Sequence, residues 1–130
     1  MIKVRIILDE PVRFDLCLGN ENKFVVIELK VIETLRGMKE RLGTLVTLDL
    51  KQRDALAGII LAFIVSPIAG RWLIDVDVVI KAIESLNEGR KIKFFPVVSK
   101  ADRHQVIDPD FLDQFSTRIL EKVKEVLAYE

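Results

Sequence analysis

The sequence predicts an α/β domain in which a central mixed β-sheet is flanked by helices. Strand-forming residues lie on both sides of a polar turn within residues 14–30, which predicts a β-hairpin. Further along the chain, apolar runs alternate with segments whose apolar residues recur at helical spacing, which predicts helices packed on the sheet. With 130 residues the chain is long enough to bury a core, and we expect one domain spanning residues 1–130.

The composition and the lack of a recognisable targeting signal lead us to expect a cytoplasmic protein. Half of the residues are apolar and 31% are charged, as in soluble globular proteins. The longest apolar run, residues 55–65, is too short to cross a bilayer, which needs about 20 residues. The N-terminus shows no signal-peptide pattern, and the single cysteine, Cys17, cannot form an intrachain disulfide. We therefore expect a cytoplasmic location and no membrane partner.

The charge balance argues against a simple nucleic-acid-binding protein. Lysine plus arginine and aspartate plus glutamate each number 20, which leaves a net charge of zero. Affinity for nucleic acid comes largely from cations that neutralise phosphates. Basic residues do cluster at 36–41, 51–53, 90–93 and 100–104, and they would matter only if the fold gathered them on one side.

The N-terminal part of the chain is expected to form strands. Residues 2–8 predict a strand that is broken at residues 9–11. Residues 14–18 and 23–30 predict the two strands of the hairpin, with a turn at residues 19–22. In this pairing Leu18 lies opposite Lys23, so that Asp15 lies opposite Val26.

Alternation along the two strands of the hairpin predicts one polar and one apolar face. Asp15, Glu28 and Lys30 project from the polar face, where diagonal neighbours lie roughly 7–8 Å apart and two carboxylates can share one ion. The opposite face is wholly apolar, and a slip of one residue would mix the two faces. Its residues are Phe14, Leu16, Leu18, Val25, Ile27 and Leu29.

The segment after the hairpin predicts a helix, a short strand and the start of a second helix. Apolar residues at helical spacing fall within residues 31–42, and Gly43 is expected to end this helix. Residues 44–48 are apolar and β-branched, as is typical of a strand. Asp49 can cap a helix that begins at Leu50. Residues 58–65 fit either a buried strand or an extension of that helix.

The remaining chain predicts two helices separated by an edge strand. Asp75 or Asp77 can cap a helix that runs to about residue 86. Residues 92–98 predict a strand at the edge of the sheet, because Pro96 cannot donate a ladder hydrogen bond. Asp108 and Pro109 form a strong helix start, and the final helix is expected over about residues 109–129.

Asp15 and the run Glu28-Leu29-Lys30 resemble the PD-(D/E)XK nuclease signature, which has an acid on one strand and acid-x-lysine on the next. The flanking residues are most similar to those of archaeal-type Holliday-junction resolvases and RecB-like nucleases. They are Asp15-Leu16, Gly19-Asn20, Lys23-Phe24 and Ile27-Glu28-Leu29-Lys30-Val31. The resemblance is clear over residues 14–31 and weaker over 44–75. It implies a restriction-endonuclease-like core, with a strand at 58–65 and a return strand at 71–74.

The resemblance also implies an activity, namely magnesium- or manganese-dependent hydrolysis of DNA phosphodiester bonds by an endonuclease. Asp15, Glu28 and the carbonyl of Leu29 would hold the metal, and Asp15, Glu28 and Lys30 would be the catalytic set. Substrate contacts are expected from the start of the following helix, at Lys51, Gln52 and Arg53. The expected partner is branched or otherwise structured DNA, such as the Holliday junctions that arise in DNA repair and recombination.

One departure from the family leaves alternatives open. Members of the family usually carry a helix before the first strand, with an acid that completes the metal site, whereas residues 1–11 predict a strand here. Glu121 or Glu125 of the C-terminal helix could replace that acid. One alternative function is a catalytically inactive nuclease-fold module that binds nucleic acid or protein. A further alternative is an unrelated α+β domain in which the Glu-x-Lys run is accidental.

A homodimer is expected as well. Junction-cutting nucleases need two active sites for two strands. Bulky apolar residues after position 60 are also more numerous than a small single-layer core readily hides. They are Leu61, Phe63, Ile64, Ile68, Trp72, Phe94 and Phe95.

Overall fold

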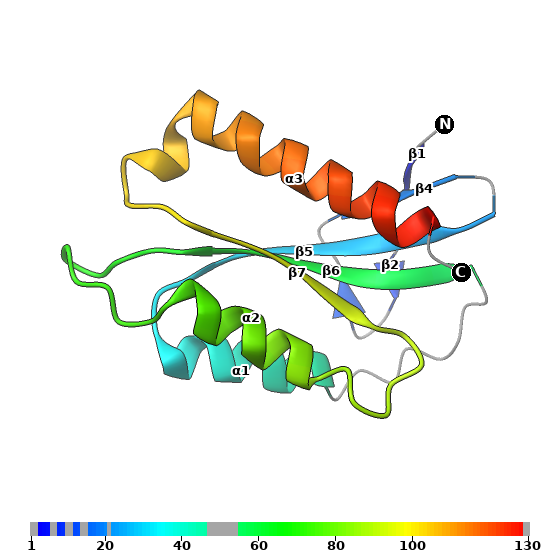
Figure 1. The fold of residues 1–130 in the computed structure, drawn as a ribbon, viewed down its shortest axis with the longest axis horizontal. Coiled ribbons are helices and arrows are strands. Elements are labelled where there is room, and N and C mark those ends of the chain that lie inside the picture. The colour runs from blue at the N-terminus through cyan, green and yellow to red at the C-terminus, as the bar shows by residue number, and fades with distance from the viewer. Residues whose placement is uncertain are drawn as a thin grey trace.

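A computed structural model describes residues 3–5, 8–9, 12–13, 16–20, 22–46 and 55–128. Within these residues, strands form a five-stranded mixed sheet in the order β1-β4-β5-β6-β7. Helix α3 covers one face of the sheet, and helices α1 and α2 lie side by side on the other (Figure 1). The expected α/β class with a mixed sheet flanked by helices is therefore confirmed. In this part of the chain no helix is long and apolar enough to cross a membrane.

The first half of the sheet is antiparallel. β1 (Lys3–Arg5) pairs with β4 (Leu16–Gly19), and β4 pairs with β5 (Phe24–Ile32). The short strands β2 (Leu8–Asp9) and β3 (Val12–Arg13) form a separate two-stranded sheet. The strand predicted over residues 2–8 is thus found at Lys3–Arg5, and the hairpin predicted over residues 14–30 is found as β4 and β5.

The second half of the sheet is parallel. Helix α1 (Leu35–Val46) precedes β6 (Leu56–Val65), and helix α2 (Val76–Ser85) connects β6 to β7 (Phe94–Lys100). β6 is buried on both faces, which explains why its sequence is a continuous apolar run and confirms a strand at 58–65. β7 is an edge strand, as Pro96 predicts. Parallel strands with helical connections are an α/β arrangement, which counts against the α+β alternative.

The side chains of β5 point alternately to the two faces of the sheet and pack in two separate hydrophobic cores. Phe24, Val26 and Ile32 pack in the cluster under α1 and α2, whereas Val25 and Ile27 pack in the cluster under α3. The apolar residues that led us to expect an oligomer are divided by this arrangement. Leu61, Phe63, Ile64 and Phe94 are buried inside the two cores, and Ile68 and Trp72 remain exposed. Surplus apolar residues in the C-terminal half are therefore weaker support for a homodimer than the sequence suggested.

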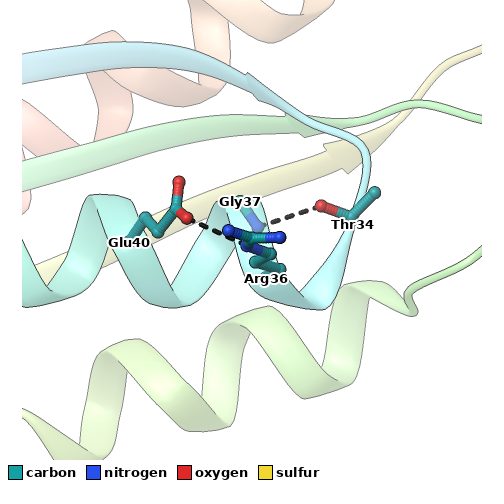
Figure 2. A network of polar contacts seen from close by, with 4 residues as sticks. All are labelled: Thr34, Arg36, Gly37 and Glu40. Atoms are coloured by element: carbon teal, nitrogen blue, oxygen red, sulfur yellow. Dashed lines mark hydrogen bonds and ion pairs between the residues drawn. The ribbon is translucent and has the colours of Figure 1, made fainter.

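Two predicted boundaries in the middle of the chain are wrong. Val31 and Ile32 end β5 instead of beginning a helix, because β-branched residues suit the sheet and Thr34 marks the helix start. Thr34 Oγ1 accepts a hydrogen bond of 2.9 Å from the amide of Gly37, which is an N-terminal cap (Figure 2). At the other end, Gly43 does not end the helix, and the predicted strand over 44–48 is wrong for residues 44–46, because α1 continues to Val46. Residues 47–54, including the predicted cap Asp49, lie outside the described residues.

The return strand predicted at residues 71–74 is also wrong. Only a single bridge joins Ile68 to Arg71, around a tight turn in which Ala69 and Gly70 both have positive φ. Such a turn reverses the chain between two residues and extends into no ladder here. The two later helices lie where the sequence predicts them. Asp75 precedes α2 but makes no side-chain cap hydrogen bond, whereas Asp108 Oδ1 accepts a hydrogen bond from the amide of Asp110 at the start of α3 (Pro109–Ala128).

Candidate functional site

The β4–β5 hairpin positions the Glu-x-Lys run. Leu16 pairs with Ile27 and Leu18 with Val25, so the predicted pairing of Leu18 with Lys23 is wrong by two residues. The shift arises in the loop, where the Asn20 side chain accepts hydrogen bonds from the amides of Asn22 and Lys23 at 2.9 and 2.8 Å. A shift of two residues preserves the faces.

The apolar face of the hairpin is as predicted for its described residues. Leu18, Val25 and Ile27 belong to the core under α3, and Leu16 and Leu29 lie partly exposed at the border of that region. Glu28 and Lys30 project from the opposite face, toward α1. Phe14 and Asp15, which the sequence assigns to the same hairpin, lie outside the described residues.

Glu28 is a buried carboxylate in the middle of the sheet. Its residue is only 4% exposed, and it is one of two buried polar residues in the described part of the chain. Glu28 Oε1 lies 3.4 Å from Nη1 of Arg41 and 3.9 Å from Nζ of Lys30. Burying a carboxylate is costly unless cations or hydrogen bonds compensate it. The two cations supply part of that compensation, so the Glu28 carboxylate is held in a defined position.

Lys30 and Arg41 reach Glu28 from two different elements. Lys30 follows Glu28 by two positions on β5, and Arg41 comes from α1, which packs across this face of the sheet. Their side chains are 36% and 34% exposed, so both reach from the buried carboxylate toward solvent. They line a pocket of about 230 Å³ together with Glu33, Thr34 and Ile68. Glu28 does not line this pocket, so the site is a buried carboxylate held by two cations that themselves border a small pocket.

The other predicted site residues divide into three groups. The side chain of Leu29 points to the opposite face, as expected if only its carbonyl were to serve the site. Asp15, Lys51, Gln52 and Arg53 lie outside the described residues, and their roles stay predictions. Glu121 and Glu125 belong to α3 on the other face of the sheet (Figure 1), so neither can complete a site at Glu28. The suggestion that α3 supplies the missing acid is wrong.

Arg41 is the residue that the sequence did not single out. It was visible there only as one member of the basic cluster at 36–41. A signal was present, because Arg41 lies three residues after Met38 and four before Leu45, both of which are buried. That spacing places Arg41 beside the buried stripe of α1, unlike Arg36, which is 89% exposed.

A second concavity lies on the opposite face of the sheet. It is an apolar groove of about 510 Å³ between the β4–β5 hairpin and α3. Partly exposed leucines border it, among them Leu16, Leu29, Leu112 and Leu120. Its walls offer little that could orient a polar substrate, so we place the candidate chemistry at Glu28.

Neither a cluster of metal ligands nor a related protein gives independent evidence for a function. Among the residues that the structure describes, no three histidine, cysteine, aspartate or glutamate side chains are grouped so that they could hold a metal ion. Asp15, the second acid of the motif, is outside that set. No family model, no curated protein and no solved structure matches the chain.

Proposed function

We propose that this protein is a metal-dependent DNA endonuclease with a restriction-endonuclease-like core. The observation that carries the proposal is the placement of Glu28 and Lys30. An acid and a lysine two residues apart on an inner strand share one face, and the lysine lines a small pocket.

A hard divalent cation would need oxygen ligands besides Glu28, because the described residues contain no group of three potential metal ligands. Glu28 offers carboxylate oxygens, the ligands that magnesium and manganese prefer, and the motif assigns Asp15 and the Leu29 carbonyl to the same ion. When bound, the metal would neutralise charge on the reacting phosphate and supply an activated water. A metal ion at Glu28 Oε1 would compete with Arg41, whose Nη1 lies 3.4 Å from that oxygen.

Lys30 would act on the reacting phosphate from the pocket side. Its ammonium is partly exposed and lies within 3.9 Å of the Glu28 carboxylate, so it can reach a group held beside that carboxylate. There it would orient the attacking water and stabilise negative charge that develops on the phosphate oxygens. Lys51, Gln52 and Arg53 would contact the DNA beyond this position.

The proposed substrate is branched DNA, and the proposed working form is a homodimer. Resolving a junction requires cuts in two strands, and one Glu28 site per chain supplies one cut. We infer a role in DNA repair or recombination from the same resemblance, and a cytoplasmic location from the sequence pattern.

A second candidate function is a nuclease-fold module that binds nucleic acid or protein without cleaving it. One observation favours it, namely that Lys30 and Arg41 already compensate the charge of Glu28. In that reading the three residues are a partly buried ion-pair network that fixes α1 on the sheet.

DNA cleavage by the wild-type protein separates the two candidates. We expect incision of a four-way junction or a flap in magnesium or manganese, slower incision of linear duplex, and no incision in EDTA. Labelled substrates on denaturing gels give the cut positions. If none of the junction, flap, single-stranded and duplex substrates is cut with either metal, the binding module is the correct reading.

A further inference from the structure

We propose that the apolar groove between the β4–β5 hairpin and α3 binds α3 of a second copy of this chain, so that two α3 helices pair antiparallel about Ser116. This inference goes beyond the endonuclease activity, because the groove lies on the face of the sheet that α3 covers and Glu28 faces α1 (Figure 1). It locates an interface for the homodimer, which the buried apolar residues of β6 and β7 do not supply.

The first step is the apolar surface that one copy leaves exposed along the groove. The groove has a volume of about 510 Å³. Leucines on its two walls are each between 37% and 43% exposed, namely Leu16 and Leu29 on the hairpin and Leu112 and Leu120 on α3. Large apolar side chains that face one concavity indicate an interaction surface, whereas scattered single ones do not.

The second step is the order of residues along α3. Residues four apart form a ridge on a helix, and ridges of this kind pack against each other when two helices meet. One such ridge contains Asp108, which precedes the helix, followed by Leu112, Ser116, Leu120 and Lys124. All five are exposed, and the three central residues line the groove. Antiparallel pairing about Ser116 therefore sets Leu112 against Leu120 and Asp108 against Lys124, each of them twice.

The third step is the charge along the helix. Residues 108–116 contain three aspartates and no cation, whereas residues 117–128 contain three cations and two glutamates. An antiparallel pair of identical helices sets the acidic half of one copy against the net basic half of the other. A parallel pair would set like charges against each other. Charge complementarity thus favours a second copy as the occupant and fixes its direction.

The fourth step is the fit of the pair. Ser116 is small and lies between two leucines, so two helices can approach closely at that point. The leucines of each copy then enter the groove of the other and reach the hairpin wall. Because Glu28 and its cations lie on the α1 side of the sheet, both pockets beside Lys30 and Arg41 stay uncovered in this dimer.

Ser116→Glu tests the interface through the dissociation constant of the dimer, measured by sedimentation equilibrium. The wild-type chain should be dimeric at high micromolar concentration. Ser116→Glu should raise the dissociation constant by about tenfold or more, because two carboxylates then meet at the centre of the contact. The matched control is Gln114→Glu, which adds the same residue at an exposed position two residues away and hence on the opposite side of α3. Its dissociation constant should equal that of the wild type.

The direction of the pair is tested by its charged ends. Lys124→Gln should raise the dissociation constant about two- to tenfold, as expected for two exposed ion pairs. Asp108→Asn should do the same and still cap α3, because asparagine is an equally good capping residue. The double variant should dimerise no more weakly than either single variant. Wild-type dimerisation of Lys124→Gln would overturn the antiparallel register.

Ser116→Cys keeps the test decisive if Ser116→Glu does not fold. Two copies paired about residue 116 should form a disulfide-linked dimer under mild oxidation, whereas Gln114→Cys should not. The native Cys17 is buried and should not interfere. A wild type that stays monomeric at high micromolar concentration would overturn the inference, and so would a folded Ser116→Glu that dimerises like the wild type. A dimer that behaves as expected but cleaves no DNA would instead overturn the proposed function and leave this interface standing.

Discussion

Glu28→Gln is expected to remove divalent-dependent DNA cleavage while leaving the protein folded and able to bind DNA. The amide keeps the shape of the side chain but carries no charge to hold a divalent cation. Its fold should survive, because Lys30 and Arg41 are one-third exposed and can turn to water when the carboxylate is gone. We expect a loss of at most about 1–2 kcal/mol in the free energy of unfolding.

Initial rates of junction cleavage in magnesium and manganese measure this effect, with thermal unfolding and DNA binding as parallel checks. Glu40→Gln is the matched control, since Glu40 is an exposed glutamate of α1 that pairs with Arg36 away from the pocket. Cleavage by Glu28→Gln at a rate similar to that of Glu40→Gln would show that the Glu28 carboxylate takes no part in the reaction.

The second large effect is expected for Lys30→Ala. Cleavage should slow by about 10²–10⁴-fold, the usual scale for the loss of one group that assists proton transfer or stabilises developing charge. Manganese affinity should not fall, because the ammonium lies beside the carboxylate and is no ligand itself. The loss should therefore lie in kcat, and single-turnover rates under saturating DNA are the measurement.

Lys39→Ala, at an exposed position of α1, is the control for a general loss of positive charge. If Lys30→Ala and Lys39→Ala cleave equally fast, the lysine of the motif contributes only to the ion pair with Glu28.

The faces of the hairpin could be predicted from sequence because they depend on parity alone. The pairing was wrong by two residues, yet Glu28 and Lys30 still share a face, since alternation has a period of two. The Asn20 side chain holds the loop through hydrogen bonds to the amides of residues 22 and 23. A general turn propensity does not predict these bonds, and so it does not predict the pairing.

Boundaries in the middle of the chain were harder to predict for a physical reason. Val31 and Ile32 fit the apolar spacing of a helix and the β-branched character of a strand equally well. The sheet determines the outcome, because both residues pair with β6. β6 itself is a continuous apolar run, in which periodicity cannot separate a buried strand from a helix.

The contact of Arg41 with Glu28 could not be predicted from sequence, because it depends on how α1 folds back over the sheet after β5. The chain must leave β5, turn at Thr34 and lay α1 back across the sheet before residue 41 comes near residue 28. Neither the facing of the hairpin nor the helical spacing gives that distance. The sequence did place Arg41 in a basic cluster, and the fold separates Arg41, which contacts Glu28, from the exposed Arg36.

A crystal structure of the protein with manganese tests the metal site most directly. We predict an anomalous scattering peak at the Glu28 carboxylate, with oxygen ligands that include Asp15, and the Arg41 guanidinium turned away from Glu28 Oε1. The absence of a peak at Glu28 in millimolar manganese, with Arg41 still against the carboxylate, would contradict metal-dependent catalysis at this site.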